Sequence, residues 1–225
     1  MSIMRQASSK SLIRFVAGVT LGLTTAIGAQ AAEGSVQAGA EKAAMCIGCH
    51  GIPGYQNAFP EVYKVPKISG QSAKYIESAL TAYQKGDRKH PTMRGIAGSL
   101  SEQDIADLAA YYGGMSQGKP LADAVEVPAG QVADLLTKGG CVACHGANYS
   151  KPLDPSYPKL AGQHADYLYA ALKAYSVEGN DMVGRNNAIM GGIAKQFSHA
   201  EMKAMAKFLA GLPGEVFTQP LNRFR

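Results

Sequence analysis

Two cysteine pairs, each followed directly by a histidine, are the residues of this sequence best suited to chemistry. Cys46, Cys49 and His50 form the first C-x-x-C-H run, and "CVACH" from Cys141 forms the second. Two thiols at this spacing can hold zinc, cycle as a redox dithiol, or attach a haem whose iron the histidine binds. These three chemistries require different surroundings, so the rest of the sequence discriminates between them.

The surroundings disfavour zinc and dithiol chemistry. Paired cysteines of a structural zinc site lie about 15–20 residues apart, whereas these two pairs are separated by more than ninety residues. A thioredoxin-like dithiol needs a strand-rich βαβ setting, and the periodicity of this chain is helical. C-x-x-C-H is the attachment signature of c-type haem. The sequence therefore predicts two covalently bound haem c groups, attached through Cys46, Cys49, Cys141 and Cys144.

The two cysteine runs belong to an internal repeat. The segment "VPKISGQSAKYIESALTAY" (65–83) matches "YPKLAGQHADYLYAALKAY" (157–175), and "MRGIAGSLSEQDIADLAAYYGGM" (93–115) matches "MGGIAKQFSHAEMKAMAKFLAGL" (190–212). Such self-similarity indicates a duplicated unit. We therefore expect two domains, at 32–115 and 132–225, joined by a linker at 116–131 that contains Pro and Gly. Units this small usually need a bound cofactor or a cross-link to stabilise the core.

Apolar residues in each repeat recur at the spacing of a helix. "SAKYIESALTAYQKG" and "HADYLYAALKAYSVEG" place them at i, i+3, i+4 and i+7. Ser101 with Asp104, and Ser198 with Glu201, resemble capping boxes and predict the start of a later helix in each half. A short helix is expected before each cysteine run, and no alternating strand pattern is visible. The predicted fold is all-α, with three or four helices in each of two tandem domains.

A haem iron bound by histidine needs its sixth position defined, and the repeat selects the ligand. Methionine there raises the reduction potential and suits electron transfer, whereas an open position suits ligand chemistry. Met93 and Met190 occupy equivalent positions, 47 and 49 residues after the first cysteine of their run, in Gly-containing loops before the last helix. We therefore predict His50 with Met93, and His145 with Met190, as the axial iron ligands.

Other methionines and histidines lack this support from the repeat. Helical spacing predicts that Met45, Met202 and Met205 pack in the core, a common role for methionine. The remaining histidines align with different residue types in the other half, so we expect surface or helix-capping positions for His90, His164 and His199.

The first 31 residues have the layout of a secretory signal peptide. Arg5, Lys10 and Arg14 precede an apolar run from Phe15 to about Gly28, and the small residues "AQA" follow it. The run is shorter than the ~20 residues that span a bilayer, which favours cleavage and a periplasmic protein. Loss of these three basic residues lowers the net charge from +5 to +2. The remaining charge is too small and too dispersed to indicate nucleic-acid binding.

On these motifs the sequence resembles the dihaem cytochrome c4 family. The resemblance rests on "CIGCHG", "PKISGQ" and "SLSEQDIADLAAYY" in the first half, on "CVACHG", "PKLAGQ" and "SHAEMKAMAKFLAGL" in the second, and on R-x4-M in both. Each half resembles a class I cytochrome c domain. The family implies that the carbonyls of Pro66 and Pro158 accept hydrogen bonds from the proximal histidines. It also implies that four side chains lie near the haem propionates: Tyr75, Tyr167, Arg88 and Arg185.

The resemblance implies an electron-transfer protein rather than an enzyme, and no nucleophile or acid–base pair stands out in the sequence. Its expected partners are redox proteins: a quinol-oxidising complex or a dehydrogenase as donor and a terminal oxidase as acceptor, with membrane association only through such complexes. An alternative is the cytochrome subunit of a periplasmic dehydrogenase, such as flavocytochrome c sulfide dehydrogenase. A dihaem peroxidase would require an open haem position and a longer chain. The second half differs by a longer insertion before Met190 and by Phe208-Leu209 in place of Tyr111-Tyr112.

Overall fold

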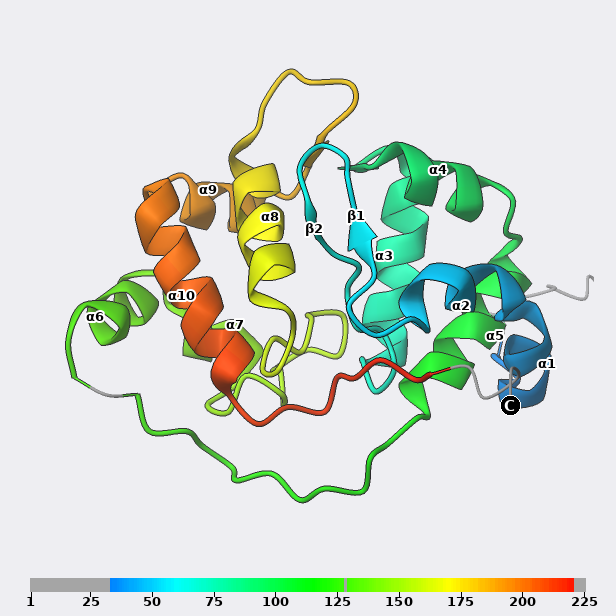
Figure 1. Ribbon diagram of the computed structural model, residues 1–225, viewed down its shortest axis with the longest axis horizontal. Helices are drawn as coiled ribbons and strands as arrows, with labels where there is room; N and C mark the ends of the chain where they lie inside the picture. Colours follow the sequence, from blue (N-terminus) through cyan, green and yellow to red (C-terminus); the bar gives the residue numbers. More distant parts are fainter. Residues whose placement is uncertain (1–32, 128, 221–225) are drawn as a thin grey trace, which may run out of the picture. The chain divides into compact units, whose positions relative to one another are not determined.

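The computed structural model describes residues 33–127 and 129–220, so the predicted signal peptide lies outside the described residues. Those residues form ten helices and four two-residue strands (Figure 1). The helices of the first half are α1 (Val36–Lys42), α2 (Ala44–His50), α3 (Ala73–Lys85), α4 (Pro91–Gly98) and α5 (Glu102–Gly113). Those of the second half are α6 (Gln131–Lys138), α7 (Cys141–His145), α8 (Ala165–Ser176), α9 (Ala188–Ala194) and α10 (His199–Gly211). The mainly helical, duplicated fold predicted from the sequence is confirmed.

Each half has five helices rather than the three or four predicted, partly because the methionine segments are helical and not loops. The side chain of His90 accepts a hydrogen bond from the Met93 backbone N–H at 3.3 Å and caps α4. Asn187 accepts one from the Met190 N–H at 2.9 Å and caps α9. Glycine lowers helix propensity in both segments, so the sequence pattern favoured loops. The capping role of His90 agrees with its predicted position.

Four short strands were not predicted. They are β1 (Gln56–Asn57), β2 (Tyr63–Lys64), β3 (Arg88–Lys89) and β4 (Gly184–Arg185). β1 pairs with β2 inside the first half, whereas β3 of the first half pairs antiparallel with β4 of the second. Two residues are too few to show an alternating pattern, so these pairings are set by tertiary contacts. The β3–β4 pair places Arg88 opposite Arg185.

Each half has its own apolar core. In the first, α1 and α3 pack on α5 around Ile76 and Leu108. In the second, α6 and α8 pack on α10, and Met202 and Met205 are buried as predicted, with 2% and 3% of their surface exposed. The prediction for Met45 is wrong, because 48% of its surface is exposed on α2. Helical spacing in so short a helix does not identify the buried face.

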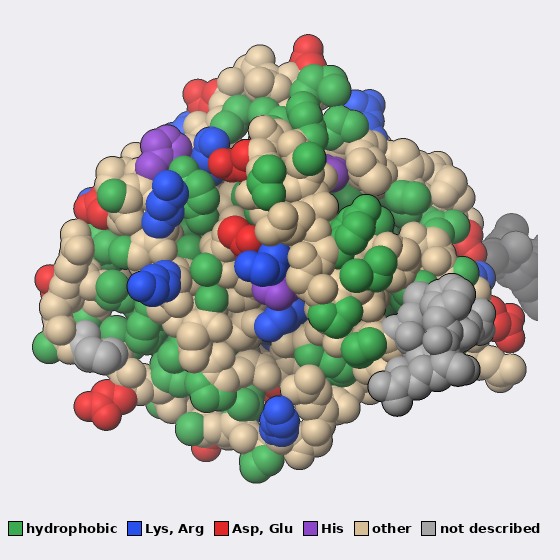
Figure 2. Space-filling view, viewed as in Figure 1, with side chains coloured by type: hydrophobic (Ala, Val, Ile, Leu, Met, Phe, Trp, Pro, Cys, Tyr) green, Lys and Arg blue, Asp and Glu red, His purple; other side chains and the backbone are tan. Residues whose placement is uncertain are grey.

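The connection between the halves has no helix or strand over 116–127, and α6 starts at Gln131 (Figure 1). Side chains of both charge signs lie interspersed among apolar ones on the face shown in Figure 2. Within the described residues, no helix has both the length and the apolar character needed to cross a bilayer.

Candidate functional site

The first C-x-x-C-H run lies on helix α2. Cys46 and Cys49 are half-buried free thiols on this helix, and His50 is its last residue. Nδ1 of His50 lies 2.8 Å from the carbonyl oxygen of Pro66. A carbonyl only accepts, so Nδ1 carries the proton and the neutral ring keeps Nε2 free to bind a metal. Burial lowers the pKa of His50, although the Pro66 hydrogen bond opposes this shift, and the neutral ring is therefore favoured.

The second run repeats this arrangement on helix α7. Cys141 and Cys144 are again half-buried free thiols, and His145 ends the helix with 7% of its surface exposed. Its Nδ1 lies 3.0 Å from the carbonyl oxygen of Pro158, and burial lowers its pKa. The two proline contacts implied by the family resemblance are thus both present in the structure.

The predicted sixth ligands lie on separate short helices. Met93 is half-buried on α4 and Met190 is half-buried on α9. The capping bonds of His90 and Asn187 go to the backbone N–H of these same methionines. Each cap therefore fixes the backbone from which the thioether side chain extends, and the ligand role of both methionines remains a prediction.

Arg88 and Arg185, opposite each other on β3 and β4, bind tyrosines of their own halves. Arg88 Nη2 donates to Tyr75 Oη at 2.8 Å, and Arg185 Nη2 donates to Tyr167 Oη at 3.0 Å. Each guanidinium also lies over a second ring, Arg88 at 5.6 Å from that of Tyr83 and Arg185 at 5.3 Å from that of Tyr175. Tyr83 and Tyr175 were not predicted as site residues, although the Ala-Tyr shared by the ends of 65–83 and 157–175 pointed to them.

The positive charge of this arginine–tyrosine cluster, formed by Arg88, Arg185 and their four tyrosines, is not balanced by a carboxylate in an ion pair among the described residues. Arg88 is only 9% exposed, and the ion pairs found in the described ranges include neither arginine. Burial raises the pKa of Tyr75 to about 12, so this phenol is neutral. Two neighbouring guanidinium groups partly removed from water are costly unless anions compensate them. The carboxylates of haem propionates are anions of the required kind, and the donor set fits them.

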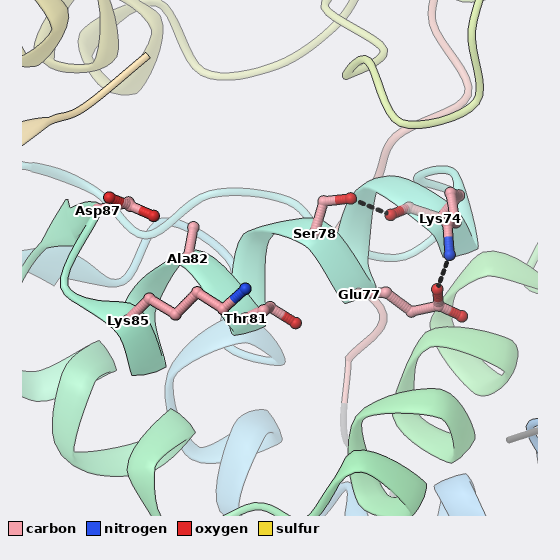
Figure 3. Close-up of a pocket in the computed structure, with 7 residues that line it drawn as sticks. All are labelled: Lys74, Glu77, Ser78, Thr81, Ala82, Lys85 and Asp87. Atoms are coloured by element: carbon pink, nitrogen blue, oxygen red, sulfur yellow. Dashed lines mark hydrogen bonds and ion pairs between the residues drawn. The ribbon is translucent and has the colours of Figure 1, made fainter. Parts of the chain in front are cut away.

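A depression along α3 is not part of these sites (Figure 3). It has a volume of about 300 Å³ and is lined by Lys74, Glu77, Ser78, Thr81, Ala82, Lys85 and Asp87. Lys74 pairs with Glu77 at 2.8 Å, and the depression contains none of the predicted site residues. Over the described ranges, no three His, Cys, Asp or Glu side chains gather as a structural zinc site requires.

Comparison with known proteins agrees with the duplicated architecture. The cytochrome c family model matches residues 36–115 and again 131–213. The chain is 32% identical to cytochrome c4 of Azotobacter vinelandii over 221 residues, which cover 91% of this chain and 99% of that protein. It is 33% identical to the thiosulfate dehydrogenase electron acceptor of Stutzerimonas stutzeri, covering 90% and 96% of the two chains. The crystal structure of reduced cytochrome c4 from Pseudomonas stutzeri aligns with a TM-score of 0.58 and 27% identity, covering 80% and 100%.

The fold and the two cysteine–histidine helices define a c-type cytochrome with two haem-binding domains. Within that class, the chain belongs to the dihaem cytochrome c4 family. It is an electron-transfer protein, and its Cys46/Cys49 and Cys141/Cys144 pairs correspond to two haem c groups.

Proposed function

We propose that this chain is an exported, periplasmic electron carrier that accepts electrons at one haem and releases them from the other. Its iron ligands would be His50 with Met93 in the first half and His145 with Met190 in the second. The observation that carries this proposal is the same histidine–proline contact in both halves, at 2.8 and 3.0 Å. We further propose domain limits of 32–115 and 132–225 around the 116–131 linker.

The histidine and methionine ligands would have different roles at the iron. Bound haem supplies an iron that alternates between the ferric and ferrous states. The proline carbonyls fix the ring orientation and tautomer of His50 and His145 and make each imidazole a more basic ligand. Met93 and Met190 would supply the remaining iron ligands from the capped helices α4 and α9. A closed coordination sphere suits electron transfer without a bound substrate.

The arginine–tyrosine cluster would serve both halves at once. Arg88 with Tyr75 would hold the propionates of the first haem, and Arg185 with Tyr167 those of the second. The β3–β4 pairing supports this assignment, because it places one guanidinium of each half at a shared boundary. Arg88 and Arg185 would thus compensate the propionate charge of both haems at that boundary.

Two kinds of donor are consistent with this carrier. One is a quinol-oxidising complex, with electrons passing on towards a terminal oxidase. The other is a dehydrogenase, and here the 33% identity to a thiosulfate dehydrogenase electron acceptor over 90% of this chain favours an enzyme that oxidises sulfur compounds.

Purified holoprotein tests the proposal. We expect two covalent haems per chain, and a single haem or bound zinc would contradict it.

Stopped-flow mixing of the oxidised protein with thiosulfate dehydrogenase plus thiosulfate, and separately with a quinol-oxidising complex plus quinol, identifies the donor by the faster haem reduction. Subsequent mixing with a terminal oxidase tests the acceptor. Reduced protein should resist carbon monoxide, whereas rapid binding would indicate an open iron position and favour a peroxidase.

A further inference from the structure

The peptide group between Pro66 and Lys67 makes two hydrogen bonds that connect different halves of the chain. Its carbonyl oxygen accepts from His50 Nδ1 at 2.8 Å, and its N–H donates to Oε1 of Gln163 at 3.0 Å. Nε2 of Gln163 donates back to the carbonyl oxygen of Lys67 at 2.8 Å. One peptide group thus joins the proximal histidine of the first half to a side chain of the second.

The second half makes the reciprocal connection. The Pro158 carbonyl accepts from His145 Nδ1 at 3.0 Å, and the N–H of Lys159 donates to Oε1 of Gln71 at 2.9 Å. Nε2 of Gln71 donates to the Lys159 carbonyl oxygen at 3.1 Å. The two glutamines therefore cross between the halves, and each binds the peptide group that holds the other half's histidine.

Both glutamines are buried and held in one orientation. Gln71 is 3% exposed and Gln163 is 4% exposed. Each Oε1 accepts a second bond, at 3.0 Å, from the backbone N–H of the next residue, Ser72 or His164. A flipped amide would direct its NH₂ group at two backbone N–H donors, so the hydrogen bonds allow only the observed orientation.

Lysine side chains reinforce the same crossing. Lys67 Nζ donates to the carbonyl oxygen of Gly162 at 2.5 Å, and Lys159 Nζ donates to that of Gly70 at 2.8 Å. Gly70 and Gly162 directly precede the two glutamines. The amide positions are therefore fixed by bonds on both sides.

We propose that Gln71 and Gln163 are positioning residues that each lower the reduction potential of the haem in the opposite half. A hydrogen bond from the peptide N–H polarises the peptide and makes its carbonyl oxygen a stronger acceptor. The histidine Nδ1–H is then bound more strongly, and the imidazole becomes a more basic ligand that favours ferric iron. This inference rests on the proposed ligand role of His50 and His145.

Substitution of each glutamine by methionine tests the inference in the holoprotein. Methionine has a similar length but neither bonds the peptide N–H nor donates to the lysine carbonyl. Gln163→Met should favour ferrous iron at the first haem by about three- to tenfold at a fixed ambient potential, and leave the second haem unchanged. This corresponds to a rise of about 30–60 mV for a one-electron couple. Gln71→Met should give the converse. Redox titrations followed by NMR, with haem methyl resonances assigned by domain, measure both sites.

The glutamate variants provide the matched control. Gln163→Glu and Gln71→Glu keep an acceptor for the peptide N–H, and a charged oxygen is a stronger one, so the opposite haem should become harder to reduce. If the glutamines had only a structural role, the Met and Glu variants should change the reduction potential of the opposite haem in the same direction. In the reduced protein, the NMR signal of the His50 Nδ1 proton should shift upfield in Gln163→Met, because its hydrogen bond to the Pro66 carbonyl becomes weaker.

The crossed pattern decides the outcome. Shifts confined to the haem of the substituted half, or equal at both haems, would overturn the inference, as would unchanged potentials. Should one methionine variant fail to fold, the variant of the other half tests the same relation. Failure of the proposed function is distinguishable, because wild-type protein would then itself lack the signatures of histidine–methionine ligation.

Discussion

The two halves share the contacts around their cysteine–histidine helices but hold their first helix differently. In the first half, the 2% exposed Asp107 of α5 accepts from the Ser35 N–H at 2.8 Å, from Gln103 at 2.9 Å and from Lys42 at 2.5 Å. The register partner of Asp107 is Ala204, which has no carboxylate. The second half instead packs α6 on α10 through an apolar cluster that includes Leu135, Leu136, Met205 and Leu209. The duplication thus retains the histidine–proline geometry in both halves, while helix packing has more than one solution.

The largest expected effect tests whether the halves are equivalent at the iron. Met93→Ala and Met190→Ala should each remove about half of the weak long-wavelength sulfur-to-iron charge-transfer band of the ferric protein. Each should also lower the potential of its own haem, because methionine ligation raises it. Visible spectroscopy and redox titration measure both effects. An unchanged band in either variant would refute that ligand and break the equivalence.

The close approach of α1 to α5 predicts the next largest effect. A Cβ on Gly39 would clash with the backbone oxygen of Asp107 and lie 2.6 Å from Cβ of Tyr111. Gly39→Ala should therefore push the helices apart and destabilise the first half by about 1–3 kcal/mol. Gly211→Ala, where nothing lies within 4 Å of the added Cβ, is the control. Denaturant unfolding of both variants checks the difference, and equal midpoints would show that α1 can shift freely.

The polar attachment of α1 should make the first half the more acid-sensitive one. Lys42, the Ser35 N–H and Gln103 hold the pKa of Asp107 down to about 2. The unfolded-state pKa of an aspartate is about 3.9, so the stabilisation is complete above that pH and is lost as the pH falls towards 2. Asp107→Asn should remove this pH dependence and lower stability at pH 7.

Unfolding midpoints measured between pH 7 and pH 2 for both proteins check this prediction. Asp123→Asn is the control, because its ion pair with Lys151 is exposed, with 94% of the Asp123 side-chain surface accessible. It should change the acid response little. A steep loss of stability in Asp107→Asn over the same pH range would place the acid sensitivity elsewhere.

The sequence predicted the parts of the sites that lie close together along the chain or recur at fixed register. The cysteine–histidine helices, the duplication and the capping boxes at Ser101 and Ser198 are local patterns, and both capping boxes are present. The proline contacts followed from family resemblance. The β3–β4 pairing and the crossed glutamines could not be predicted in this way, because they depend on how one half packs against the other. The shared Gly-Gln of the repeats was visible, but nothing in it identified the acceptor about ninety residues away.

The smallest expected effect concerns a hydroxyl group that only the first half carries. Tyr112 is 3% exposed, and apart from the Cys46 sulfur beside it, a weak acceptor, its hydroxyl finds no hydrogen-bond partner in the described part of the chain. Its register partner is Leu209, which buries a similar apolar surface with no polar atom. Because a buried hydroxyl without a strong acceptor is unfavourable, Tyr112→Phe should leave stability unchanged or raise it by up to about 1 kcal/mol. Leu209→Ala, which removes apolar volume at the equivalent position, should instead cost about 2–5 kcal/mol.

Denaturant unfolding of the holoprotein measures both, and a loss of about 1 kcal/mol or more in Tyr112→Phe would show that the hydroxyl is bonded there. The difference between Tyr112 and Leu209 would then be one of hydrogen bonding and not of packing alone.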